Sequence, residues 1–200
     1  MVEYRNEYDN FGGEMIPFER RLLFKYIVEA EPNAVFELGS GSGGSTRIIL
    51  SALNALGKGT LYNCDPYNQS VMDIEDVDVS RMKFHLMRSD EMCGVLVRNG
   101  IYPDFVLFDG PEDPYCAVND FRYLDAVLPQ GSYIAVHDWE VRPRIDGNTS
   151  TKAQCLRPHL QDCVGMGAWE IIEELSGVGG EYPNDTGYNS VGMVIARKIA

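Results

Sequence analysis

Basic residues and long apolar runs are both scarce in this sequence. Only 17 lysines and arginines stand against 30 aspartates and glutamates, which gives a formal net charge of −13. A protein that binds nucleic acid normally presents a basic surface, so this balance argues against a nucleic-acid partner. No apolar stretch approaches the length of a membrane span, which argues against a membrane partner as well.

Cysteine patterns and leader segments typical of exported proteins are also missing. The five cysteines are an odd number, and no two of them form a C-x-x-C pair. The first nine residues are polar and charged, unlike a secretory signal. We therefore expect reduced thiols and a cytoplasmic protein. The length predicts a single domain over residues 1–200, with an N-terminal arm and helix at 1–30 and a candidate substrate lid at 140–170.

What the sequence does contain is a regular alternation of short apolar strands and amphipathic helices. The spacing predicts strands at 34–37, 60–64, 82–87, 105–108 and 132–136, and helices at 17–29, 46–56, 89–98 and 115–128. The tail is predicted to be largely helical over 152–175 with breaks near Pro158 and at 165–167, and then to form strands at 177–182 and 191–198. This order predicts an α/β fold, a doubly wound and mostly parallel seven-stranded sheet with helices on both faces and a C-terminal antiparallel strand pair.

The most informative segment runs from Val35 to Thr46. Glu37 ends an apolar strand, a loop with four glycines follows, and a helix then begins with Ser45 as its expected cap. Glycine lets the backbone approach a ligand closely, and the start of a helix presents N–H groups without partners. This pattern predicts a site for a nucleotide-type cofactor.

Two cofactors are compatible with this loop. Gly39, Gly41 and Gly44 match the G-x-G-x-x-G dinucleotide pattern, and Asp65 lies at the spacing expected for a ribose contact, which favours an NAD(P)-dependent oxidoreductase. However, a full helix precedes the first strand, little length remains for a substrate domain, and Glu37 would face an anionic pyrophosphate. An acidic residue there suits S-adenosylmethionine, which carries an ammonium and a sulfonium and no phosphate. The oxidoreductase remains an alternative.

Four features of the chain resemble the class I S-adenosylmethionine-dependent methyltransferases. They are the E-x-G-x-G-x-G loop at 37–43, Asp65 after the second strand, the strand and aspartate at 105–109, and the closing strand at 189–197. The segments 43–46, 104–110 and 134–138 are similar to the small-molecule O-methyltransferases of the macrocin and catechol type. The resemblance implies a Rossmann-like methyltransferase fold and transfer of a methyl group from S-adenosylmethionine to a small molecule, with a hydroxyl oxygen as the expected acceptor.

The resemblance also implies a cofactor site at the carboxyl ends of the strands. Glu37 would approach the methionine amino group, the glycines would pass under the cofactor, and Asp65 would accept hydrogen bonds from the ribose hydroxyls. The implied cofactor-binding residues are Glu37, Gly39, Ser40, Gly41, Gly43, Ser45, Asp65, Pro66, Tyr67, Ser89, Asp90 and Asp109.

The same resemblance places a catalytic centre after the fourth and fifth strands. Asp109, His137 and Asp138 occupy the positions of a divalent metal site, for Mg²⁺ or another divalent cation. Catalysis would involve Asp109, His137 and Glu112, and the candidate general bases are His137, Glu112 and Asp113. The chain departs from both patterns, since Trp139 replaces the amide of the catechol type and no histidine follows Asp109 and the next glycine. A cofactor-binding module without catalysis therefore stays open.

Two further groups of residues each allow two interpretations. The basic residues after the fifth strand either hold an anionic acceptor or form an ordinary solvated loop; they are Arg142, Arg144, Lys152, Arg157 and His159. The N-terminal aromatic residues either cover the pocket or pack the arm against the core or a second subunit of a homodimer; they are Tyr4, Tyr8, Phe11 and Phe18.

Overall fold

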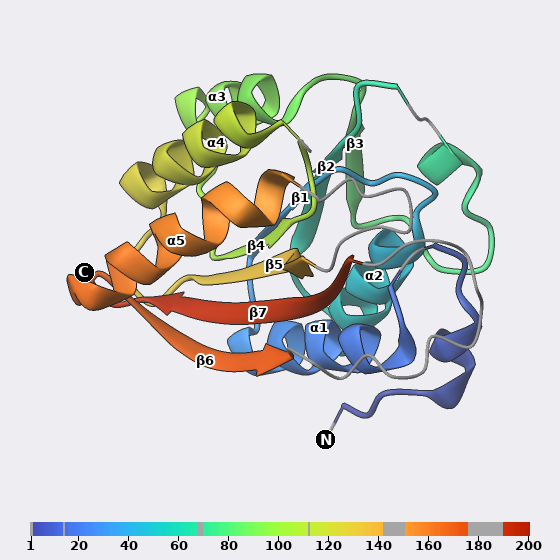
Figure 1. Cartoon of the computed structure of the whole chain (residues 1–200). Helices are drawn as coiled ribbons and strands as arrows, with labels where there is room; N and C mark the ends of the chain where they lie inside the picture. Colours follow the sequence, from blue (N-terminus) through green and yellow to red (C-terminus); the bar gives the residue numbers. More distant parts are fainter. Residues whose placement is uncertain (1, 14, 68–69, 112, 142–150, 176–189) are drawn as a thin grey trace. The chain divides into compact units, whose positions relative to one another are not determined.

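The computed structural model describes residues 2–13, 15–67, 70–111, 113–141, 151–175 and 190–200 (Figure 1). The strands are β1 (Ala34–Leu38), β2 (Thr60–Cys64), β3 (Met82–His85), β4 (Phe105–Phe108), β5 (Tyr133–Val141), β6 (Trp169–Leu175) and β7 (Ser190–Lys198). The helices are α1 (Pro17–Ala30), α2 (Gly44–Leu56), α3 (Ser89–Arg98), α4 (Pro114–Val127) and α5 (Thr151–Gly165), with 3-10 turns η1 (Asn6–Asn10) and η2 (Ser70–Asp73).

The strand order is β3-β2-β1-β4-β5-β7-β6, a mostly parallel sheet whose last two strands in sequence run antiparallel to each other. The predicted fold class is therefore confirmed. The chain forms two compact units, Met1–Gly110 and Pro111–Ala200. Among the described residues, no helix combines the length and the apolar character that crossing a bilayer requires.

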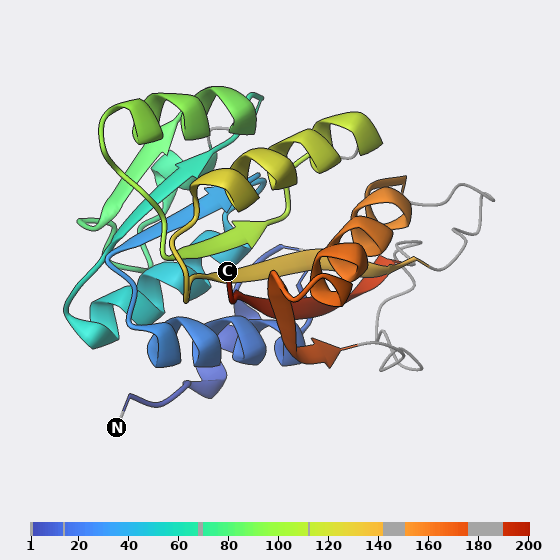
Figure 2. The same ribbon diagram turned by 90° about the vertical axis from the view of Figure 1, so that its left-hand side faces the viewer.

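In the first unit, β1 is the central strand. It pairs in parallel with β2 on one side and β4 on the other, and β2 pairs in parallel with β3. Helices α1 and α2 cover one face of these strands and α3 covers the opposite face (Figure 2). Every residue of β1 is buried, Glu37 included, as expected for a parallel strand covered on both faces. The parallel direction brings the ends of β1, β2 and β4 to one edge of the sheet.

In the second unit, β7 lies between β5 and β6 and is antiparallel to both. Helices α4 and α5 pack side by side, and α5 also contacts β5 and β6 (Figure 1). Leu156 and Leu160 place the apolar side of α5 in the core of this unit.

Three predictions about the second half of the chain are wrong. Helix α5 continues through Pro158, because its buried apolar face is held against the sheet and α4 although proline supplies no N–H. The segment that follows is the strand β6, which places Trp169 in a strand instead of a helix. Finally, β5 extends past Val136 to Val141 through a register shift against β7. The strand predicted at 177–182 lies outside the described residues.

The N-terminal arm packs against α1, which is one of its two predicted roles. The rings of Tyr4 and Tyr8 lie 5.4 and 5.8 Å from the ring of Phe24, measured between centroids. Arg20 of α1 donates hydrogen bonds to the carbonyl oxygens of Tyr8 and Asp9, at 3.1 and 2.7 Å. Both bonds come from Nη1 of a largely buried guanidinium, and they fix the arm to the helix.

Candidate functional site

The loop after β1 is held by hydrogen bonds to both neighbouring strands. The backbone N–H groups of Gly39 and Ser40 both donate to the Cys64 carbonyl oxygen at 3.1 Å, and Asp109 N–H donates to the Leu38 carbonyl oxygen at 3.1 Å. Gly39 has φ +88°, and a Cβ there would lie 2.5 Å from the Asp109 carbonyl oxygen. Only glycine fits this position without displacement of backbone. The structure thus brings together the predicted cofactor residues that follow β1, β2 and β4.

Asp65 is oriented by two backbone amides of the same edge. Its Oδ2 accepts a hydrogen bond from Gly41 N–H at 3.0 Å, and its Oδ1 accepts one from Tyr67 N–H at 2.8 Å. A carboxylate oxygen can accept more than one hydrogen bond, so this carboxylate can still receive a ribose hydroxyl. Pro66 and Tyr67 are exposed, and Tyr67 retains 92% of its accessible surface. These side chains stay predicted contacts of the cofactor.

Glu37 is buried at the end of β1, and its carboxylate is directed at the first turn of α2. Ser45 Oγ donates to Oε1 at 2.6 Å, and Thr46 Oγ1 donates to Oε2 at 2.7 Å. Burial raises the Glu37 pKa to about 7, although hydrogen bonds from Ser45, Thr46 and Asn63 oppose the shift. Glu37 therefore anchors α2, and the N-cap of α2 is Gly43 instead of the expected Ser45. Its predicted contact with the methionine amino group remains a prediction.

The N-terminal arm reaches the start of α2, which the sequence analysis missed. A Cβ on Gly44 would lie 2.0 Å from the Gly12 carbonyl oxygen, and one on Gly13 would lie 3.1 Å from the Gly44 Cα. Such an approach requires glycine on both segments. The adjacent pair Gly12-Gly13 was the available signal. The arm therefore lies directly beside the glycine loop.

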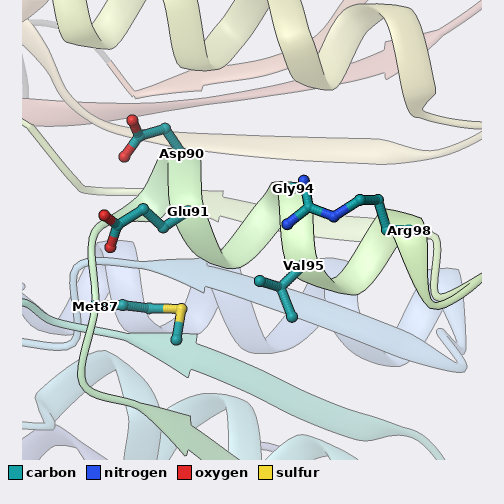
Figure 3. Close-up of a pocket in the computed structure, with 6 residues that line it drawn as sticks. All are labelled: Met87, Asp90, Glu91, Gly94, Val95 and Arg98. Carbon is teal, nitrogen blue, oxygen red and sulfur yellow. The ribbon is translucent and has the colours of Figure 1, made fainter.

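The predicted adenine side of the site lies at the start of α3. Ser89 is the first residue of the helix, and Asp90 follows it. Figure 3 shows a groove along α3, lined by Met87, Asp90, Glu91, Gly94, Val95 and Arg98. Arg88 pairs with Asp90 at 3.2 Å on the exposed surface. Ser89 and Asp90 stay predicted cofactor residues.

In the second unit, His137 and Asp138 lie inside β5 and do not end it. The register shift falls between His137 and Glu140, and Asp138 has the left-handed φ of +56°. Both residues are buried, and His137 Nδ1 lies 3.5 Å from Asp138 Oδ1. Lys152 of α5 places its Nζ 3.0 Å from Asp138 Oδ2.

Lys152 bears directly on the predicted metal site. Two carboxylates and an imidazole are suitable ligands for a divalent cation. Lys152 is fully buried, however, so its ammonium places a positive charge on Asp138 where little water screens it. Lys152 therefore competes with a divalent cation for Asp138, and the metal site of Asp109, His137 and Asp138 stays a prediction. The interpretation of Lys152 as part of a solvated loop is wrong.

Arg157 and His159 of this stretch have partners within the second unit. Arg157 Nη2 lies 3.1 Å from Glu174 Oε1, and its guanidinium carbon lies 5.3 Å from the Trp139 ring centroid. The His159 ring packs edge-on against Phe121. Arg142, Arg144 and the candidate base Glu112 lie outside the described residues.

Comparisons with known proteins place the chain in a family and a fold. A family model described as a methyltransferase domain matches residues 36–139. No curated protein sequence matches the chain significantly. An O-methyltransferase candidate from Klebsiella pneumoniae has a similar structure, with a TM-score of 0.71 and 15% identity, covering 100% of this chain and 93% of that one. The O-methyltransferase TomG from Streptomyces achromogenes, solved with S-adenosylmethionine, gives a TM-score of 0.69 and 15% identity, with 100% and 92% covered.

The fold is shared with enzymes that act on other acceptors. An rRNA methylase from Streptococcus thermophilus gives a TM-score of 0.60 and 14% identity, with 94% of this chain and 100% of that one covered. At such identities the likeness shows the fold alone. The fold therefore does not define the acceptor.

Proposed function

Because the chain belongs to this methyltransferase family, we propose that it transfers a methyl group from S-adenosylmethionine to a hydroxyl oxygen of a small molecule. The glycine loop carries the proposal. Gly39 is confined between the Cys64 carbonyl oxygen and the Asp109 backbone, and Asp65 is oriented by Gly41 at the same edge. This edge combines close backbone approach, a helix start and a ribose-type acceptor.

The proposed reaction is a displacement at the methyl carbon. A lone pair of the acceptor oxygen forms the new C–O bond, the C–S bond breaks, and its electron pair leaves with the sulfur as S-adenosylhomocysteine. The hydroxyl proton passes to a base, for which His137 and Glu112 are the candidates, and Asp109 lies beside the glycine loop. The protein mainly aligns the two reactants. No step passes through a metal ion.

The charge of the chain supports a small acceptor. A formal net charge of −13 opposes binding to a polyanion such as rRNA, because phosphate contacts supply most of such affinity. The sequence alone, with five basic residues between 140 and 160, favours an anionic acceptor, although Lys152 and Arg157 already pair with Asp138 and Glu174.

Cofactor binding is the first test. Calorimetry should show saturable binding of S-adenosylhomocysteine and no binding of NAD. Asp65→Asn should weaken the affinity by about tenfold, whereas Asp76→Asn, at an exposed acid paired with Arg47, should leave it within about twofold. Binding of NAD without S-adenosylhomocysteine would replace this proposal with the oxidoreductase.

Turnover is the second test. Release of S-adenosylhomocysteine should be measured against a panel of anionic and neutral hydroxyl compounds, with rRNA as a comparison substrate. We expect turnover with a member of the small-molecule panel. Activity on rRNA alone would overturn the assigned acceptor class. Cofactor binding without turnover on any substrate would favour a non-catalytic module.

A further inference from the structure

Lys152 is a buried cation that the proposed reaction does not use. Its side chain has no accessible surface, and lysine is almost never fully buried without a partner. The Nζ atom lies 3.0 Å from Asp138 Oδ2, a carboxylate that is itself only 11% exposed. A buried pair of this kind is retained only when each charge satisfies the other, since removal of either partner leaves an uncompensated charge.

The backbone of Asp138 is shaped for this contact. Its φ of +56° is uncommon outside glycine, although aspartate tolerates it better than most residues. The conformation coincides with the register shift of β5 against β7, where a strand redirects a side chain. With the carboxylate so turned, Oδ2 meets Lys152 and Oδ1 lies 3.5 Å from His137 Nδ1. Unusual backbone of this kind is often kept at functional sites.

We propose that Lys152 supplies, at Asp138, the positive charge that a divalent cation would otherwise supply, so that Asp138 binds no metal. A cation on Asp138 would either displace the buried ammonium of Lys152 from this carboxylate or lie beside it as a like charge. Lys152 is then a positioning residue that holds the Asp138 carboxylate. The corollary that methyl transfer needs no metal rests on the function proposed above.

The lysine ammonium and a divalent metal ion differ in the number of ligands that each requires. An ammonium is a compact charge with three N–H donors, and one of them is directed at Asp138. A divalent cation would need several oxygen or nitrogen ligands at once. Lys152 satisfies the carboxylate from α5 and within the second unit alone.

Manganese binding tests the proposal without any assay of turnover. The intact chain is titrated with Mn²⁺ and free Mn²⁺ is followed by electron paramagnetic resonance. Wild type should show no site with a Kd below about 100 μM, and Asp138→Asn should not change the titration. Lys152→Ala should gain at least about tenfold in Mn²⁺ affinity, because it removes the ammonium that lies against Oδ2. Lys58→Ala, which removes the exposed partner of Glu31, should gain nothing.

Each result decides between the alternatives. A wild-type site tighter than about 100 μM that Asp138→Asn abolishes would overturn the proposal. If Lys152→Ala does not fold, the titrations of wild type and Asp138→Asn still show whether Asp138 binds Mn²⁺. Lys152→Gln then takes the place of Lys152→Ala in the test for a gain of Mn²⁺ affinity. Tight Mn²⁺ binding together with S-adenosylhomocysteine binding would refute the role of Lys152 and leave the methyltransferase intact. Chelator-treated wild type should keep its turnover within about twofold, and a loss that Mn²⁺ restores would refute the corollary.

Discussion

Each of the two units contains a buried carboxylate, and the two are stabilised differently. In the first unit, neutral hydroxyls of Ser45 and Thr46 donate to Glu37. In the second, the ammonium of Lys152 pairs with Asp138. Neutral donors do not offset the loss of water around a negative charge, which is why burial raises the Glu37 pKa to about 7. A full opposite charge stabilises a buried carboxylate more strongly than neutral donors do. It also makes the fold more sensitive to mutation, because removal of either partner leaves the other charge buried without its counter-charge.

The strand arrangement explains why the first unit holds the glycine loop and the second unit holds the ion pair. In the first unit the strands run parallel, so Gly39, Asp65 and Asp109 follow different strands and meet at one edge. In the second unit β7 runs antiparallel to β5, and the register shift turns Asp138 toward α5. The left-handed backbone of Gly39 thus shapes the glycine loop, whereas Asp138, one irregular residue of a strand, forms the ion pair.

The largest expected effect is on the ion pair of the second unit. Lys152→Met should lower the free energy of unfolding by about 3–5 kcal/mol, because a buried Asp138 carboxylate loses its counter-charge. The double variant Asp138→Asn/Lys152→Met should recover part of this loss. Lys58→Met, which removes an exposed pair with Glu31, is the control and should cause no measurable change. Urea denaturation at pH 8 measures all three, and equal losses for Lys152 and Lys58 variants would contradict the comparison.

Glu37 should make stability depend on pH. Its pKa rises from 4.5 in the unfolded chain to about 7 in the folded one, so the folded state binds the proton more tightly. The Glu37 contribution to stability is therefore fully present below pH 4.5 and is lost as the pH rises through 7, by about 3 kcal/mol. Glu37→Gln should remove this slope. Denaturation curves between pH 5 and about 8 test it, and an unchanged slope in the variant would assign the effect to other groups.

Alanine variants of Gly39 and Gly57 distinguish a steric clash from the strain of a positive φ, because only Gly39 has backbone against its Cβ position. Gly39→Ala should destabilise by about 2–3 kcal/mol and abolish cofactor binding, because its Cβ would meet the Asp109 carbonyl oxygen. Gly57 is the matched control, with a φ of +69° and nothing within 4 Å of the position that a Cβ would take. Gly57→Ala should lose only about 1 kcal/mol and keep cofactor binding. Thermal unfolding measures the loss of stability, and titration with S-adenosylhomocysteine measures the loss of binding. Similar losses in the two variants would show that the contact with the Asp109 carbonyl oxygen is not the cause.

The smallest effect concerns the hydroxyl groups that support Glu37. Thr46→Val removes a donor at 2.7 Å with little change of shape and should destabilise by about 1–2 kcal/mol at pH 8. The loss should shrink at pH 5, where Glu37 is protonated. Thr46→Ser keeps the hydroxyl and should show no such pH dependence. If the Val and Ser variants behave alike at both pH values, the hydrogen bond is not what supports the carboxylate.

Local patterns were enough to predict the parallel half of the fold. β2, α3 and β4 have the predicted bounds, because short apolar runs and capped amphipathic turns are local signals. The glycine loop, Asp65 and Glu37 were predicted as cofactor residues from the same kind of signal, and these roles stay predictions. The contacts of Glu37 with Ser45 and Thr46 were not predicted, although these residues lie only eight and nine positions away. Sequence patterns do not show where a side chain points once its strand is buried.

The sequence by itself determined the alternating elements, the glycine loop and the family, because each depends on residues close together along the chain. Only the tertiary structure decided that Lys152 is buried against Asp138 and that Gly12 lies against Gly44. A lysine among other basic residues looks solvated until α5 packs on β5 and removes the water around it. The glycine pair of the arm looks like an ordinary loop until the backbone of Gly44 lies against Gly13 and the carbonyl oxygen of Gly12 lies against Gly44. Both depend on contacts between distant segments, which composition and spacing do not record.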